Sequence, residues 1–164
     1  MSDTPPAERL IESWADYHAA VLEVLERATH TFFLFDHDFS ETGLESIQGA
    51  EALVALARRT SQAVAIRLLV RDATYIERNC ARLMHVLTDF APRIAIKVLT
   101  PEQNAPDTAF VIADDKNLAL RFHFERPRGR VNLDNGVIAA EPFDQFKILW
   151  ASAANGSAAR ALGL

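Results

Sequence analysis

Three polar residues, Asp36, His37 and Asp38, follow a short apolar run near the start of the chain. Residues 31–35 in that run predict a buried strand, so the polar residues stand at its carboxyl end, the edge where open α/β sheets place their sites. Two carboxylates and an imidazole suit acid–base chemistry or a divalent metal. We favour a structural alternative, in which the aspartates cap backbone amides, because consecutive strand residues point to opposite faces. We therefore predict neither a metal nor a cofactor here.

Arg71 ends a second apolar run, residues 64–70, which also predicts a strand. If the two strands are parallel, Arg71 reaches the same sheet edge as Asp36 and its neighbours. We expect it to form an ion pair there rather than to take part in catalysis.

Basic residues gather later in the chain, where Arg121, Arg126 and Arg128 accompany His123. The planar guanidinium group forms paired hydrogen bonds with phosphate or carboxylate, so these four residues are a candidate anion site. The alternative is a basic loop that pairs with the protein's own acidic side chains, such as Glu125. The sequence favours this alternative.

The elements that position these residues follow from apolar periodicity. Steps of three and four indicate a helical extension over residues 1–29, with Pro5 and Pro6 in the first turn of its helix. The elements expected next are a strand at 31–35, a helix at 47–59, a strand at 64–70, one helix at 76–90 and a strand at 94–99. Those expected last are a hairpin of strands at 108–113 and 118–124, a strand at 136–139, a helix at 143–153 and a frayed tail at 155–164. Alternating helices and strands predict one α/β domain over residues 1–164, with a mixed, mostly parallel sheet flanked by helices.

The second hairpin strand shows the alternation of a strand with one buried face. We expect one face to be buried, with Leu118, Leu120, Phe122 and Phe124, and the other to carry Arg121, His123 and Glu125.

Several strings resemble one repeat of the phospholipase D superfamily. The run from Asp107 to Lys116 falls where that family carries its H-x-K-x4-D motif, with an apolar strand and an acidic turn at matching spacing. The closing stretches at 132–137 and 146–150 also resemble the end of such a repeat. The resemblance covers residues 29–153 and implies a single phospholipase D-like repeat.

The motif is degenerate. Asp107 stands at the position of the nucleophilic histidine and Ala109 at that of the lysine, while Asp114 is retained. The family's chemistry uses the imidazole as nucleophile and lysines to hold phosphate oxygens, and neither aspartate nor alanine replaces them. The resemblance therefore implies a non-catalytic domain that acts as a binding or regulatory module for an unknown protein or anionic ligand.

Two other functions remain open. One is a divergent phosphodiesterase or nuclease that uses other groups, such as His37, His123 and Arg121. The other is a structural interaction protein. Arg121 stands where the family has a small residue beside the substrate phosphate, and we expect it to pair internally with Asp107 or Asp114; the alternative is that it binds an external anion.

Composition limits the partners. The formal net charge of −5 disfavours nucleic acid as the main ligand, since nucleic-acid binding needs a surface that neutralises phosphates. Neither a membrane-spanning run nor a signal peptide is evident in the sequence, and the single cysteine, Cys80, cannot form an intramolecular disulfide. We expect a cytoplasmic protein. Because active family members combine two repeats, the resemblance also implies a homodimer.

Overall fold

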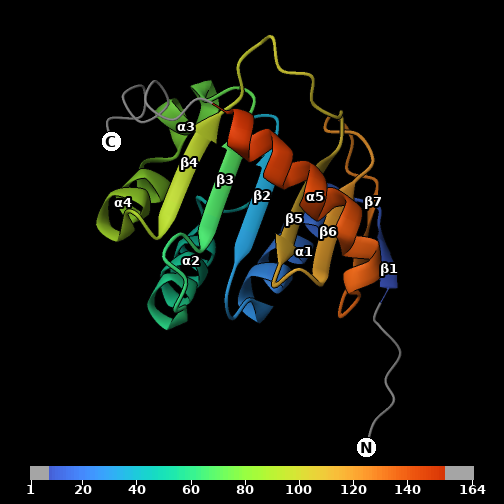
Figure 1. Cartoon of the computed structure of the whole chain (residues 1–164), viewed down its shortest axis with the longest axis horizontal. Coiled ribbons are helices and arrows are strands. Elements are labelled where there is room, and N and C mark those ends of the chain that lie inside the picture. Colours follow the sequence, from blue (N-terminus) through green and yellow to red (C-terminus); the bar gives the residue numbers. More distant parts are fainter. Residues whose placement is uncertain (1–7, 154–164) are drawn as a thin grey trace, which may run out of the picture.

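The computed structural model describes residues 8–153, which form a seven-stranded sheet with helices on both faces (Figure 1). The strands are β1 (Glu8–Ile11), β2 (Phe32–Asp36), β3 (Ile66–Val70), β4 (Ile94–Val98), β5 (Ala109–Ala113), β6 (Asn117–Arg121) and β7 (Gly129–Asn132). The helices are α1 (Trp14–Arg27), α2 (Ile47–Arg59), α3 (Thr74–Asn79), α4 (Ala81–Phe90) and α5 (Gly136–Ser152). The predicted α/β class is confirmed.

The sheet is mixed, with strand order β1-β7-β6-β5-β2-β3-β4. Only the β2–β3 and β3–β4 pairs are parallel, and the other four pairs are antiparallel. The expectation of a mostly parallel sheet is therefore wrong. Short connections join β5 to β6 and β6 to β7, and such connections serve antiparallel neighbours, whereas β2, β3 and β4 are separated by crossover helices.

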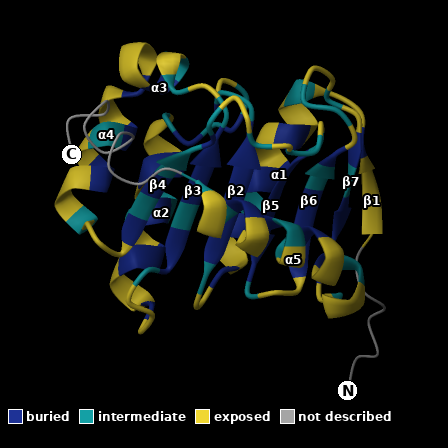
Figure 2. Ribbon diagram, turned by 45° about the horizontal axis from the view of Figure 1, so that its top comes forward, coloured by how far each residue is buried: buried dark blue, intermediate teal, exposed yellow. Residues whose placement is uncertain are grey.

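Helices cover the two faces of the sheet unequally. The larger apolar cluster lies between one face and the helices α1, α2, α3 and α4, and the smaller one lies between the opposite face and α5. Every residue of β2 and β5 is buried, as the central strands in Figure 2 show. No helix within residues 8–153 is long and apolar enough to cross a membrane.

The N-terminal segment differs from the predicted helical extension. Residues 8–11 form the edge strand β1, which pairs with β7, and α1 begins only at Trp14. Ser13 fixes this start, because its hydroxyl accepts a hydrogen bond from the Asp16 N–H at 3.1 Å. Pro5 and Pro6, like the predicted tail at 155–164, lie outside the described residues.

The single helix predicted over 76–90 is two helices that break at Cys80, where φ is −118° and ψ is 51°. The carboxylate of Glu45 explains the break. It accepts hydrogen bonds from the backbone N–H groups of Arg82 and Leu83, each at 3.1 Å, and so caps the first turn of α4. A residue that is distant in sequence supplies this cap.

The last strand is also displaced. Residues 136–139, predicted as a strand, form the first turn of α5, which Asn135 caps by accepting the Ile138 N–H at 3.1 Å. Pro142 lies inside that helix. Because proline usually interrupts a helix, the sequence predicted a helix that begins only after it. The true last strand, β7, begins at Gly129, where a Cβ atom would overlap the Leu120 carbonyl oxygen.

Candidate functional site

The neighbouring strands β2, β5 and β6 have ends on the same side of the sheet, where β2 and β6 end and β5 begins. Ala109 pairs with Arg121, and Phe35 pairs with Phe110, so Asp36, Ala109 and Arg121 lie in one row across these strands. Phe35 and Phe110 belong to the apolar cluster under α5. By alternation, the three residues of the row point to the opposite face, toward α1.

A buried ion pair spans this row. The Arg121 Nη2 donates to Asp36 Oδ1 at 2.7 Å, and the two side chains are only 2% and 3% exposed. The Arg121 Nη1 donates to the Phe124 carbonyl at 2.8 Å. From α1, the rings of Trp14 and Tyr17 stack against the guanidinium, with centroids 5.1 and 4.5 Å from its central carbon. The expected internal pairing of Arg121 is present, but its partner is Asp36 instead of Asp107 or Asp114.

Burial dominates the electrostatics of the pair. It raises the pKa of Asp36 to about 6, although the Arg121 charge and the His37 backbone N–H both lower it. Burial, followed by the Asp36 charge, also raises the pKa of Tyr17. Within the described residues, Asp36 Oδ2, Arg121 Nε and the Tyr17 hydroxyl have no hydrogen-bond partner. The pair therefore leaves polar atoms unsatisfied in the interior, which is uncommon in folded proteins.

A cavity of about 390 Å³ opens beside this pair, and we call it the Asp36 cavity. Its lining includes Asp36, Arg121, Trp14, Phe124, Asp38, Glu41 and Glu125. His37 also lines it, with its ring stacked on Phe124 at a centroid distance of 4.5 Å. The structure thus brings together Arg121 and the Asp36-His37-Asp38 string, two candidate groups that lie far apart in the sequence.

The remaining residues of the candidate anion site do not line this cavity. His123 stacks on Phe124 at 4.8 Å, and its Nδ1 accepts the Glu125 N–H at 3.2 Å. Arg126 and Arg128 are exposed, and neither forms an ion pair within the described residues.

The facing predicted for residues 118–124 is correct within β6, where Leu118 lies in the cluster under α5 and Arg121 faces α1, but it is wrong beyond the end of the strand. β6 ends at Arg121, so strand alternation does not continue into the loop. Arg121 is buried, whereas Phe122, expected in the core, is 49% exposed.

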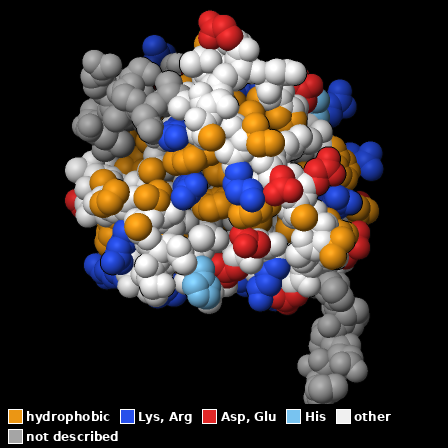
Figure 3. Space-filling model, in the orientation of Figure 1, with side chains coloured by type: hydrophobic (Ala, Val, Ile, Leu, Met, Phe, Trp, Pro, Cys, Tyr) orange, Lys and Arg blue, Asp and Glu red, His pale blue; other side chains and the backbone are white. Residues whose placement is uncertain are grey.

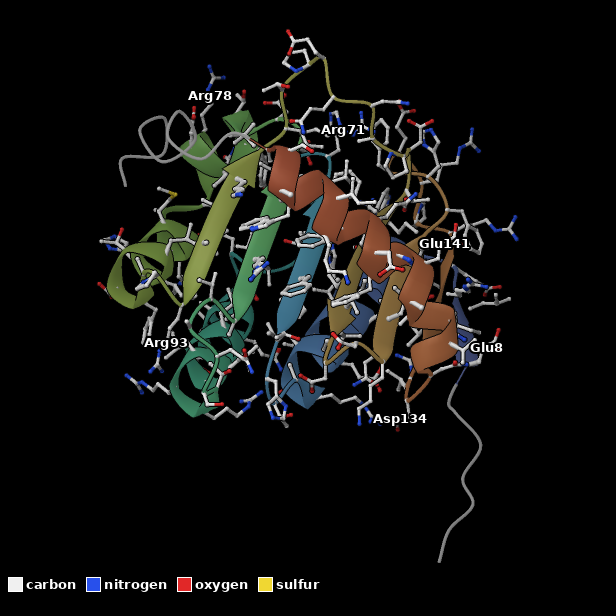
Figure 4. All side chains as sticks on the ribbon, in the orientation of Figure 1. Glu8, Arg71, Arg78, Arg93, Asp134 and Glu141 are labelled. Atoms are coloured by element: carbon white, nitrogen blue, oxygen red, sulfur yellow. The ribbon has the colours of Figure 1, made fainter. Side chains whose placement is uncertain are left out.

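Arg71 lies at the end of β3, beside the long connection from β4 to β5 (Figure 4). Its guanidinium donates to the carbonyls of Ala105 and Pro106, at 2.8 and 2.6 Å, and lies 4.0 Å from Asp107. Arg71 also donates its backbone N–H to the carbonyls of Asp36 and His37. It therefore holds the connection against the end of β2 and does not line the Asp36 cavity.

The three motif positions lie in different surroundings. Asp107 is exposed, and Ala109 is fully buried between Asp36 and Arg121. Asp114 accepts the backbone N–H groups of Thr29, His30 and Thr31 and the Thr29 hydroxyl at 2.9 to 3.2 Å. Burial opposes ionisation of Asp114, but these hydrogen bonds together lower its pKa. Asp114 therefore ties the end of β5 to the start of β2.

In the described part of the chain, the side chains that could bind a metal lie too far apart to share an ion. Among residues 8–153, no group of three or more His, Cys, Asp or Glu residues could hold a metal.

Comparison with solved structures identifies the fold. Nuc from Salmonella typhimurium, a phospholipase D family member, aligns with a TM-score of 0.66 and 13% identity over 92% of this chain and 98% of its own. NucT from Helicobacter pylori aligns with a TM-score of 0.61 and 12% identity over 92% and 99%. TrmBL2, an archaeal chromatin protein whose structure shows a mode of DNA binding, aligns with a TM-score of 0.65 and 14% identity over 94% and 56%. The chain therefore has a phospholipase D-like fold.

No curated protein matches the chain. The chain belongs to the family described as Domain of unknown function (DUF7931), which it matches over residues 13–162.

Proposed function

We propose that this chain is a non-catalytic phospholipase D-fold domain that acts as a binding or regulatory module. The observation that carries this proposal is the Arg121–Asp36 pair, which spans Ala109, the position of the motif lysine. The expected nucleophile position holds Asp107, an exposed acidic side chain. A phosphodiester placed against these two positions meets neither the imidazole nor the lysine ammonium group of the family motif.

The charge of the site supports the same proposal. The Asp36 cavity is lined by four carboxylates and one guanidinium, a formal charge of −3. Both terminal nitrogens of that guanidinium already donate within the protein. Catalysis of phosphoryl transfer depends on donors and positive charge around the phosphate oxygens, so this site repels the substrate instead of stabilising its transition state.

We expect no phosphodiesterase activity from the purified protein, because the groups that attack and hold the phosphate are missing. The measurement is turnover of bis-p-nitrophenyl phosphate and of a labelled oligonucleotide. Turnover that disappears in His37→Ala or His123→Ala would overturn the proposal in favour of a divergent enzyme. Turnover that survives both substitutions points to a contaminating enzyme.

Nucleic-acid binding is the second candidate, and one surface favours it. On the face that carries α5, basic side chains lie among hydrophobic ones (Figure 3). Arg67 and Lys97 stack against Trp150, and Lys147 against Phe143. A surface that combines aromatic and basic side chains suits the binding of single-stranded nucleic acid. The net charge of −5 weighs against nucleic-acid binding. If the domain does bind nucleic acid, adding the protein should raise the fluorescence anisotropy of a labelled oligonucleotide, and added salt should reduce this rise.

We also propose that the domain forms a homodimer, because active members of the fold family combine two repeats. We propose a reducing cytoplasm as its location, because its only cysteine, Cys80, is buried and has no second cysteine with which to form an intramolecular disulfide. Sedimentation equilibrium at tens of micromolar is expected to give twice the chain mass of 18.2 kDa. A mass equal to that of one chain would refute the dimer.

A further inference from the structure

An arginine side chain emerges from the middle of the sheet, on the face that α5 covers. Arg67 lies on β3, where its register partners are Phe33 on β2 and Ala95 on β4. Its guanidinium stacks on the rings of Phe33 and Trp150, whose centroids are 5.2 and 5.7 Å from its central carbon. Within residues 8–153 the guanidinium forms no ion pair and donates no hydrogen bond. The two rings therefore orient the group but leave its donors unused.

A second cation lies near Arg67. Lys97 on β4 has its Nζ 4.7 Å from the ring centroid of Trp150 and donates to the carbonyl of that residue at 2.8 Å. Burial lowers the pKa of Lys97, and the charge of Arg67 lowers it further. Lys97 forms no ion pair with any described residue. Two like charges thus share a partly buried region without a paired carboxylate, and an external anion would relieve their repulsion.

Arg67 lines a cavity of about 510 Å³, which we call the Arg67 cavity. It lies beside α5 at the end of the sheet where β2 and β3 begin, because its lining includes residues that precede these two strands. The Asp36 cavity lies at the other end of β2. Besides Arg67, the lining comprises apolar, polar and charged side chains: Phe33, Val64, Phe143, His30, Thr31, Gln62, Lys147, Asp114 and Asp115.

The two carboxylates of this lining do not neutralise Arg67. Asp114 already accepts hydrogen bonds on both oxygens, from backbone N–H groups and a threonine hydroxyl. Asp115 is exposed and forms no ion pair within residues 8–153. Lys147 has only a surface ion pair with Asp144, and such pairs are weak. The cavity therefore offers Arg67 and Lys147 to an anion, and Asp115 to a hydroxyl group.

We propose that the Arg67 cavity binds a small phosphate monoester that also carries hydroxyl groups, such as a sugar phosphate, with its phosphate on Arg67 and Lys147. The planar guanidinium forms paired hydrogen bonds with phosphate oxygens, and the stacked rings hold it ready to do so. The hydroxyl groups of the ligand donate to Asp115. The proposal rests on the binding role given above and names the chemistry of the ligand.

Isothermal titration calorimetry with ribose 5-phosphate tests the site. Binding is expected and should weaken with added salt. Arg67→Gln should weaken it at least about ten-fold, the effect of losing a charge-assisted hydrogen-bond donor, and Lys147→Gln about two- to five-fold. Arg78→Gln is the matched control and should leave binding unchanged. Arg78 is exposed on α3, which follows β3 at the opposite end of the sheet from the cavity (Figure 4).

Asp115→Asn gives a change of opposite sign. Removal of this carboxylate is expected to strengthen the binding of inorganic phosphate, because it removes a repulsive charge from the lining. The parent should bind ribose 5-phosphate more tightly than inorganic phosphate. Equal affinity for the two would overturn the part of the proposal that concerns hydroxyl groups.

Thermal unfolding separates a binding role of Arg67 from a structural one. Ribose 5-phosphate should raise the Tm of the parent. Arg67→Met keeps an apolar contact with the two rings and removes the unpaired charge, so its Tm without ligand should stay within about 4 °C of the parent's, and the rise should disappear. A large fall in Tm together with an unchanged rise would assign Arg67 to the fold and overturn the proposal.

The remaining outcomes distinguish this site from the proposed function. Equal affinity of Arg67→Gln and the parent for ribose 5-phosphate would overturn the phosphate site. Binding only of an oligonucleotide that lacks a terminal phosphate would overturn it in favour of a nucleic-acid surface. Absence of any binding, together with absence of phosphodiesterase activity, refutes the phosphate site and leaves the non-catalytic domain standing.

Discussion

Replacement of Arg121 by alanine is expected to lower the free energy of unfolding by about 3–5 kcal/mol at pH 7, the usual cost of removing one partner of a buried ion pair. The guanidinium is 2% exposed and donates to the Asp36 carboxylate and to the Phe124 carbonyl. Its removal leaves a carboxylate without its countercharge and a carbonyl without its donor. It also opens a space beside Trp14 and Tyr17. Urea unfolding followed by circular dichroism measures the change.

Two variants separate the pair from general effects of mutation. Arg128→Ala removes an exposed arginine from the following loop and is expected to change stability by less than about 0.5 kcal/mol. Arg121→Met combined with Asp36→Leu removes both charges at similar volume and should recover most of the loss. A loss below about 1 kcal/mol in Arg121→Ala would show that the pair is not the buried, coupled unit described here.

The same pair sets a pH dependence of known sign. The Asp36 pKa is raised to about 6 in the folded protein from an unfolded value of 3.8, so the folded state binds more protons between these values. The stabilisation from this proton is complete below pH 3.8 and is lost as the pH rises through 6. Without the Arg121 charge, the pKa of Asp36 rises further. The cost of Arg121→Ala should therefore be smaller at pH 5 than at pH 7.

Periodicity predicted most elements of the fold because the signal is local to each element. β2, α2, β3 and β4 lie close to their predicted ranges. The errors occur where distant residues decide the outcome. The side chain of Glu45 divides the helix predicted over 76–90, and β1 forms because β7 offers it an edge. No window of residues around Cys80 or Glu8 contains that information.

The site could be predicted only in parts. Asp36 and Arg121 were each singled out by residue type and position, but their partnership depends on β2 and β6 flanking β5. We expected Arg121 to pair with Asp107 or Asp114, the two aspartates that flank β5. Its partner is Asp36 instead, because β2 lies on the other side of β5 from β6. The contact between Trp14 and Arg121 could not be predicted, because an aromatic residue in an amphipathic helix is most simply interpreted as packing that helix. A buried arginine facing that helix gives it a second role.

Ala109 links this pairing to the proposed absence of the family's chemistry. Ala109 is fully buried and lies between Asp36 and Arg121 in the row across β2, β5 and β6. A small side chain at this position lets the arginine reach across the middle strand to the carboxylate. A lysine, which the family motif carries here, would place a second cation beside a single buried carboxylate. The motif lysine and the Arg121–Asp36 pair are therefore incompatible in this sheet.

Ala109→Lys is accordingly expected to lower the free energy of unfolding by more than about 4 kcal/mol or to prevent folding, since it adds both volume and an unpaired charge to the interior. Ala109→Met adds similar volume without charge and should cost only about 1–3 kcal/mol. Combining Ala109→Lys with Arg121→Ala lets the new ammonium group take over the Asp36 carboxylate. The two substitutions together should then cost about 1–3 kcal/mol less than the sum of their separate effects. Additive costs in this double-mutant cycle would mean that positions 109 and 121 do not compete for Asp36, and would remove the main support for a site closed to phosphodiesters.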